Sequence, residues 1–227
     1  MQFTRLYVVV EGQSEREFVK ELLGPHLALR MLDVKPKVVV TNRKLNKRGG
    51  INNYGLLRSD LVRLLAEDRA LDCRFTTMID LYKLPADFPG RAIAAKQKVR
   101  ADKVTALEAA FRDDLGDPRF IPHLQVHEFE TLLYCDLGQL AKRIDGSSPG
   151  IAALGQEVAG LDPEDINEGL TTAPSKRIVK HVPIYDNLKV RVGAPAASAI
   201  GLSTLRTNCP HFGAWVTTLE QLGTPLG

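Results

Sequence analysis

The sequence predicts an α/β fold with a mostly parallel sheet of about four strands flanked by helices. Apolar runs typical of buried strands alternate along the chain with segments whose apolar residues recur at helical spacing. This alternation is typical of βαβ units, in which a helix connects one parallel strand to the next. Two of the strands also end on an acidic residue, Glu11 and Asp80, at the edge of the sheet where α/β proteins bind ligands.

The first strand is predicted over residues 3–10, where the run Leu-Tyr-Val-Val-Val at 6–10 is typical of a strand buried on both faces. A helix should follow, because Ser14 and Glu17 have the spacing of a capping box. Its buried stripe consists of apolar residues at helical spacing, namely Phe18, Leu22, Leu23, Leu27 and Met31. The same patterns predict strands over 35–41, 74–79 and 120–126, and helices over 54–68, 92–115 and, shorter, from 127.

Residues 1–137 are therefore predicted to form an α/β core. Residues 80–90 contain two prolines and a glycine, which exclude regular secondary structure there. From 138 to 227 the chain shows only short helical patterns broken by glycine and proline. This region is predicted to be an α-helical C-terminal cap packed on the core rather than a second independent core.

The composition is that of an ordinary globular protein, with 44% hydrophobic and 25% charged residues among 227. The net charge of +3 is too small to indicate nucleic-acid binding by itself. Three widely separated cysteines exclude a disulfide framework and a structural zinc ribbon. No apolar stretch approaches the roughly 20 residues that cross a bilayer, so we expect a soluble, cytoplasmic protein that does not associate with membranes.

The acidic residues at the two strand ends predict a divalent metal site. Mg²⁺ prefers hard oxygen ligands, which rigid strand ends can hold in place. Glu11 and Asp80 would satisfy this requirement if their strands are neighbours. The structural alternative is that Glu11 is a turn residue and Asp80 caps a loop.

A second acidic segment, His127-Glu128-Phe129-Glu130, has two geometric interpretations. On a helix, His127 and Glu130 would share a face, and Glu128 would point elsewhere. In an extended segment, Glu128 and Glu130 would share a face and His127 would oppose them. We favour a helix start with Glu130 directed to the site and Glu128 second. A charged helix N-terminus that merely favours the helix dipole remains the structural alternative.

Basic residues form candidate phosphate contacts at several points. Residues 43–50 place Arg43, Lys44, Lys47 and Arg48 before two glycines, whose backbone N–H groups can approach an anion closely. Further candidates are Lys83, Lys176 and Arg177. For the loop, the alternative is an ordinary solvated segment.

These segments together resemble the TOPRIM-like (topoisomerase–primase) nuclease superfamily, and more closely an uncharacterised bacterial family of TOPRIM-like proteins. The resemblance lies in Val-Glu-Gly-Gln-Ser-Glu at 10–15, in the segment 80–90 and in Gln-x-His-Glu-Phe-Glu at 125–130. Pro-Ser-Lys-Arg at 174–177 and Cys-Pro-His-Phe at 209–212 extend it over almost the whole chain.

The resemblance implies a TOPRIM-like, Rossmann-like core whose acidic residues hold Mg²⁺ (or Mn²⁺). It also implies nucleic acid, DNA or RNA, as a partner. Several relatives are encoded beside an ABC- or SMC-type ATPase and act in phage defence, so such an ATPase and a second copy of the chain are further candidate partners. The usual Asp-x-Asp of the superfamily reads Asp80-Leu81-Tyr82 here. Asp87, Glu128 or Glu130 would have to replace the second aspartate.

Two functional hypotheses follow. The first is a Mg²⁺-dependent nuclease, with Glu11 as general base or metal ligand, Asp80 as the main ligand, and Glu130 or Glu128 completing the site. The second is a catalytically degenerate binding or regulatory subunit of an ATPase, because the second aspartate is missing. Phosphoryl transfer to or from a nucleotide ranks lower, because the sequence has no Gly-x-x-x-x-Gly-Lys-Ser/Thr loop.

Overall fold

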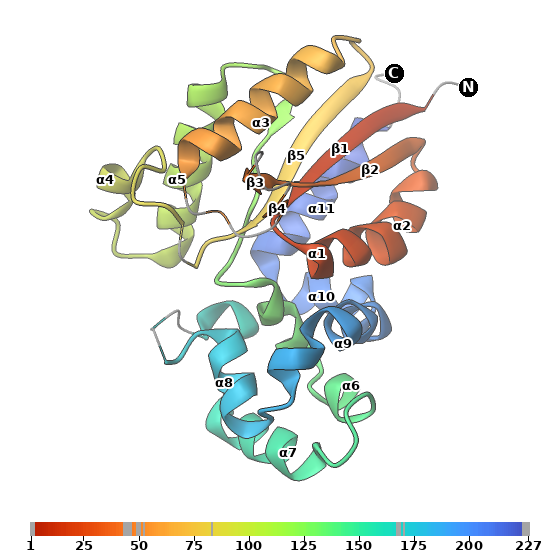
Figure 1. The fold of residues 1–227 in the computed structure, drawn as a ribbon, viewed down its shortest axis with the longest axis vertical. Helices are drawn as coiled ribbons and strands as arrows, with labels where there is room; N and C mark the ends of the chain where they lie inside the picture. The colour runs from red at the N-terminus through yellow and green to blue at the C-terminus, as the bar shows by residue number, and fades with distance from the viewer. Residues whose placement is uncertain are drawn as a thin grey trace.

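A five-stranded parallel sheet forms the centre of the N-terminal region and confirms the predicted α/β fold class (Figure 1). The computed structural model describes residues 3–42, 47–48, 51, 53–82, 84–166, 169 and 171–223. The strand order is β2 (Leu32–Val38), β1 (Thr4–Val10), β5 (Cys73–Asp80) and β6 (Phe120–Ile121), and β7 (Leu124–Gln125) also pairs with β5. A separate antiparallel pair joins β3 (Val40–Asn42) to β4 (Lys47–Arg48).

The order of the strands creates a switch point between β1 and β5. From β1 the chain crosses to β2 on one side, and it later returns to place β5 on the other side of β1. Crevices at such a switch point, outside the carboxyl ends of the strands, are where open α/β sheets bind ligands. Glu11 follows the last residue of β1, and Asp80 is the last residue of β5.

Helices cover both faces of this sheet, which explains the uninterrupted apolar run of β1. On one face, Val8 and Val10 belong to a cluster with residues of α1 (Gln13–Phe18), the π-helix η1 (Val19–Leu23) and α11 (Pro210–Leu222). On the other face, Val9 belongs to a cluster with residues of α3 (Tyr54–Glu67) and α5 (Arg100–Leu115). Because alternate side chains of β1 enter two cores, every position from Val8 to Val10 is buried.

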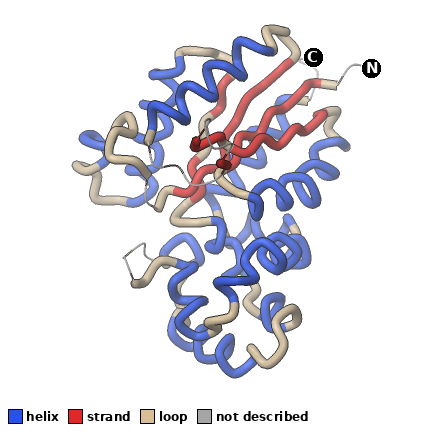
Figure 2. The backbone as a smooth tube through the Cα atoms, viewed as in Figure 1, coloured by secondary structure: helices blue, strands red, loops and turns tan. Residues whose placement is uncertain are grey.

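The region after residue 137 is helical, as expected, and the lower part of the view consists of helices and loops (Figure 2). Its elements are α6 (Gly138–Ala141), α7 (Ser148–Glu157), the short 3-10 helix η3 (Pro163–Asp165), α8 (Pro174–His181), α9 (Tyr185–Ile200), α10 (Leu202–Asn208) and α11. Helix α9 packs against α1, and Trp215 of α11 donates its indole N–H to Thr76 Oγ1 of β5 at 2.9 Å. The last helix is thus part of the cover of the sheet.

Several predicted boundaries are wrong. The helix after β1 begins at Gln13 with Gly12 as its N-cap, so Ser14 is not the cap. The helical segment ends with α2 (Gly24–Ala28), and Met31 lies beyond it with φ +62°. The second strand begins at Leu32 instead of 35 and ends at Val38. It accommodates Pro36 because β2 is an edge strand, where a missing N–H is tolerated.

Two predicted elements are divided in the structure. The helix expected over 92–115 is α4 (Arg91–Ala94) followed by α5, and no residue from 95 to 103 is buried. Without packing on this stretch, nothing holds a single long helix together. The strand expected over 120–126 is β6 and β7, separated by Pro122 and His123, because Pro122 has no N–H for a ladder.

In the part of the chain that the structure describes, no helix combines the length and apolar character that crossing a membrane requires.

Candidate metal centre

Five carboxylates meet at the carboxyl edge of the sheet. Glu11 and Asp80 come from the ends of β1 and β5, as predicted. Glu15 reaches the site from the first turn of α1, and Glu128 and Glu130 come from the start of the 3-10 helix η2 (Phe129–Cys135). The five carboxylates also interact electrostatically with one another. The pKa of the Asp80 carboxyl is raised well above its ordinary value by burial first, and then by the other four carboxylates.

Asp80 and Glu11 are tied to the backbone around them. Asp80 Oδ1 accepts a hydrogen bond from the N–H of Phe129 at 2.9 Å, which fixes the start of η2 against the end of β5. Glu11 Oε1 accepts a longer one, 3.4 Å, from the N–H of Ile51. Burial raises the pKa of Glu11, and nearby Glu128 and Glu130 raise it further, against the lowering effect of backbone hydrogen bonds from Ile51 and Asp80.

Glu128 is extended (φ −142°, ψ 165°) and caps η2. Both of its oxygens are also bound by Ser175 at the start of α8, where the backbone N–H donates to Oε2 at 2.8 Å and the hydroxyl donates to Oε1 at 3.0 Å. The sequence Pro-Ser-Lys-Arg at 174–177 therefore supports an acidic residue of the site through its serine.

Glu130 lies in the first turn of η2 and is buried. Its Oε1 accepts a hydrogen bond from the hydroxyl of Tyr185 at 3.2 Å, and the ammonium of Lys189 lies 3.9 Å away. Burial raises the pKa of Glu130 to about 7, with a further contribution from Glu128 and an opposing one from Lys189. Burial also raises the pKa of Glu15 to about 7.

The structure combines parts of the two interpretations of the acidic segment. Glu130 is on a helix and directed inward, as favoured, but Glu128 precedes the helix and enters the same buried cluster. His127 does not share a face with Glu130. Its backbone has φ +60°, and its Nε2 lies 3.0 Å from the backbone oxygen of Glu164. This left-handed residue lets the chain turn sharply between β7 and η2.

Glu15 is the acidic residue that the sequence analysis did not assign to the site. A signal was present, because Glu15 closes the Glu-Gly-x-x-Glu pattern that begins at Glu11. Its buried position on α1 places it beside Glu11, which raises its pKa further.

The remaining predicted site residues lie elsewhere. Asp87 is exposed and accepts hydrogen bonds from the N–H of Tyr54 at 3.1 and 3.2 Å, at the start of α3. Lys176 is exposed on α8, and Arg177 pairs with Glu157 and donates to the backbone oxygen of Thr172. Arg43, Lys44 and Lys83 lie outside the described residues, as do the side chains of Lys47 and Arg48.

Tyr82 stands where the superfamily pattern has its second aspartate. Its backbone N–H donates to the carbonyl oxygen of His127 at 2.7 Å. The segment after β5 is thereby bound to the segment before η2, so the backbone of Tyr82 helps to hold Glu128 beside Asp80.

A second group with potential metal ligands comes from α5, from the connection between β6 and β7, and from the start of α11. Glu108, His123 and His211 offer ligand atoms within 4.8 Å of one another. Hydrogen bonding accounts for much of this geometry, because Glu108 Oε1 accepts from the N–H of Leu124 at 2.8 Å and lies 3.0 Å from His211 Nε2. His123 is buried and stacks on Trp215 with ring centroids 4.2 Å apart. Burial lowers the pKa of His123 well below its ordinary range, so its ring is neutral.

The donor set of the acidic cluster fits a hard divalent cation. All five side chains offer carboxylate oxygens, the ligands that Mg²⁺ prefers. Burying them together is costly unless a positive charge compensates, as the raised pKa values of Asp80, Glu15 and Glu130 indicate. A counter-charge from the protein itself is the ammonium of Lys189, 3.9 Å from Glu130 Oε1. The chemistry of these donors suits a metal such as Mg²⁺ or Mn²⁺. Among the described residues, the three side chains whose ligand atoms already lie within 4.8 Å of one another are Glu108, His123 and His211.

The fold and the site define an α/β protein with an acidic centre at the switch point of a parallel sheet. The chain belongs to the DUF4276 family, a domain of unknown function, whose model matches residues 10–220 and so includes all five carboxylates. No curated protein matches the chain significantly. Among solved structures, it is similar to the C-terminal region of the Xanthomonas campestris pv. campestris OLD protein, with 15% identity, a TM-score of 0.40 and 96% of each chain covered. At this level of similarity the function has to be argued from the site.

Proposed function

We propose that this protein is a Mg²⁺-dependent nuclease that hydrolyses phosphodiester bonds of DNA or RNA. The observation that carries the proposal is the group of five carboxylates at the switch point of the sheet, of which Glu15, Glu128 and Glu130 are buried and the other two are partly buried. The resemblance of residues 10–15 and of the Asp80 strand end to TOPRIM-like nucleases supports the same conclusion.

In this proposal Asp80 and Glu11 are the main ligands of the cation, and Glu130 and Glu128 complete the site. The bound cation would stabilise negative charge on the scissile phosphate and activate a water molecule. Glu15, which is not among these ligands and whose pKa is about 7 in the metal-free protein, is suited to accept and release a proton at neutral pH. Tyr185 positions Glu130 through its hydroxyl. Phe129 and Ser175 position Asp80 and Glu128 through backbone N–H groups.

The test is cleavage of supercoiled DNA, linear DNA and structured RNA in Mg²⁺, Mn²⁺ or EDTA. Asp80→Asn keeps an oxygen that can accept from Phe129 but removes the charge, so it should abolish cleavage. Asp87→Asn is the matched control, because Asp87 is an exposed aspartate that binds the backbone of α3. Cleavage that survives in Asp80→Asn, or that proceeds equally well in EDTA, would refute the proposal.

A second candidate function is a non-catalytic binding or regulatory subunit of an ABC- or SMC-type ATPase. Two observations favour it: Tyr82 replaces the second aspartate of the superfamily pattern, and Ser175 occupies both oxygens of Glu128. Calorimetry with Mg²⁺ separates the two functions. Tight binding that Asp80→Asn abolishes supports the nuclease, whereas co-purification with a neighbouring ATPase and no Mg²⁺ binding supports the subunit.

A role in phage defence rests on the TOPRIM-like resemblance alone. Protection of a bacterial host that carries the gene, compared with a host that carries the Asp80→Asn variant, would test it directly.

A further inference from the structure

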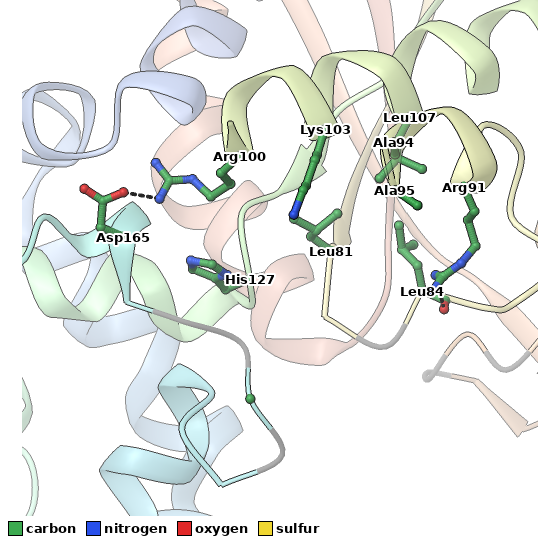
Figure 3. Close-up of a pocket in the computed structure, with 11 residues that line it drawn as sticks. Leu81, Leu84, Arg91, Ala94, Ala95, Arg100, Lys103, Leu107, His127 and Asp165 are labelled. Atoms are coloured by element: carbon green, nitrogen blue, oxygen red, sulfur yellow. Dashed lines mark hydrogen bonds and ion pairs between the residues drawn. The ribbon is translucent and has the colours of Figure 1, made fainter. Parts of the chain in front are cut away.

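A cavity of about 580 Å³ lies beside the acidic centre, between the end of β5, the helices α4 and α5, and η3 (Figure 3). Its polar lining includes Arg91, Arg100, Lys103, His127 and Asp165, and the rest is mainly leucine and alanine. The volume falls within the range of about 300–1,000 Å³ that is typical of small-molecule sites. A lining with apolar walls and a basic group at one side suits a ligand that is part flat ring and part anion.

The basic residues of this cavity differ in the hydrogen bonds and ion pairs that they make with the rest of the protein. Arg91 donates to the backbone oxygen of Leu84 at 2.9 Å, so it is held by the cavity wall. Arg100 forms an ion pair with Asp165, whose side chain is about half exposed. Lys103 extends from α5 toward the cavity, which Leu81 also lines (Figure 3). Three guanidinium or ammonium groups face one carboxylate, so the cavity favours an anion.

The cavity and the acidic centre are built on the same two backbone segments. Leu81 lines the cavity and follows Asp80, and His127 lines the cavity and precedes Glu128. The two segments are bound together by the hydrogen bonds Leu81 N–H to Gln125 O, 2.9 Å, and Tyr82 N–H to His127 O, 2.7 Å. Each segment thus carries a carboxylate of the acidic centre next to a residue that lines the cavity, so the two sites share one backbone support.

We propose that the cavity binds one nucleotide of the substrate strand, adjacent to the phosphodiester that the acidic centre would cleave. Its phosphate contacts Lys103 and Arg100, and its base lies against the side chains of Leu81 and Leu107. The proposal rests on the nuclease function in naming the ligand. It goes further in giving the enzyme a single-nucleotide subsite, which implies that a free 5′-mononucleotide competes with the substrate.

The experiment measures binding of 5′-deoxyadenosine monophosphate by calorimetry in EDTA, so that no metal bridges the phosphate to the carboxylates. Lys103→Ala should weaken binding by about tenfold or more, because a charge-assisted hydrogen bond is lost. Lys98→Ala is the matched control, since Lys98 is an exposed lysine before α5 that does not line the cavity. Both lysines are exposed, and circular dichroism verifies that both variants fold.

Two further ligands separate the sources of affinity. Inorganic phosphate and deoxyadenosine should each bind at least tenfold more weakly than the mononucleotide if both the basic and the apolar walls contribute. Absence of mononucleotide binding, an equal loss in Lys98→Ala, or equally tight binding of phosphate alone would overturn the proposal.

The outcome is independent of cleavage. In EDTA, Asp80→Asn should bind the mononucleotide at least as tightly as the wild type, because Asp80 does not line the cavity and a neutral amide does not repel the phosphate. Cleavage without mononucleotide binding would overturn the subsite and leave the nuclease proposal in place. Binding without metal-dependent cleavage would leave the subsite in place and refute the nuclease.

Discussion

Replacing Glu130 by glutamine should make the metal-free protein less sensitive to pH. Burial and the neighbouring carboxylates raise the pKa of Glu130 from an ordinary 4.5 to about 7. Below pH 4.5 Glu130 is protonated in both the folded and the unfolded chain and contributes nothing to the pH dependence. Between pH 4.5 and 7 the unfolded chain loses this proton first, so the free energy of unfolding falls as pH rises.

The magnitude follows from the rise in pKa. One pKa unit corresponds to about 1.4 kcal/mol, so ionised Glu130 costs about 3 kcal/mol of folding free energy at pH 8. Glutamine cannot ionise, and its amide oxygen can still accept the hydrogen bond from Tyr185. The partner Lys189 is partly exposed, so its loss of a counter-charge is a small effect.

The assay is urea unfolding at pH 5 and pH 8 in EDTA. From pH 5 to pH 8 the wild type should lose about 2–3 kcal/mol more of its unfolding free energy than Glu130→Gln does. Glu21→Gln, at an exposed position of η1, serves as the control and should retain the wild-type slope. Mg²⁺ should reduce the wild-type loss, because a bound cation favours the ionised carboxylates. If the unfolding free energy changes equally with pH in the wild type and in Glu130→Gln, the claim that burial and neighbouring carboxylates raise the pKa of Glu130 is refuted.

Three further predictions concern the site and its scaffold. Asp80→Asn should reduce cleavage by at least about 100-fold, because several kcal/mol of transition-state stabilisation depend on the cation. The same variant should raise the free energy of unfolding in urea at pH 8 without metal. Unchanged cleavage together with lower stability would contradict this prediction. Gly90→Ala should destabilise by about 1–3 kcal/mol, because φ is +78° and the added Cβ would lie 2.6 Å from Ala110 Cβ; a neutral result in the same assay would show that this turn can rearrange. Trp215→Phe should cost about 1–3 kcal/mol by leaving the buried Thr76 hydroxyl without the indole donor. Adding Thr76→Val should recover part of that cost in a double-mutant cycle, and strict additivity would rule out the hydrogen bond as its cause.

The strands that carry Glu11 and Asp80 could be predicted from the sequence because their signal is local. A run of apolar residues that ends on a carboxylate can be identified without knowing which strand pairs with it. That β1 and β5 are neighbours is a property of the strand order, which local periodicity does not determine. The switch point that makes the two carboxylates one site therefore had to come from the structure.

The second acidic segment shows where a local pattern is insufficient. The prediction had to choose between helix and strand over residues 127–130, whereas the chain changes conformation within the segment. His127 adopts φ +60°, which is uncommon for a residue other than glycine, and this turn directs Glu128 inward. Contacts from distant residues, Ser175 and Tyr185, then hold both glutamates.

The cavity beside the acidic centre could not be predicted from the sequence, because the pattern over residues 92–115 predicted a single helix. Residues 95–99 interrupt that helix and separate α4 from α5, and Arg100 and Lys103 then line the cavity together with Leu81, which follows β5. The interruption follows from a lack of buried side chains between 95 and 103, which depends on tertiary packing and not on helix propensity.

Anomalous diffraction from a crystal soaked in Mn²⁺ would locate the cation and identify its ligands. We expect a peak at the carboxyl edge of the sheet, bound by Asp80 and Glu11 with Glu130 or Glu128 nearby, and no such peak in a crystal of Asp80→Asn. A peak only at Glu108, His123 and His211, or none at all, would contradict the assignment of the acidic centre as a metal site.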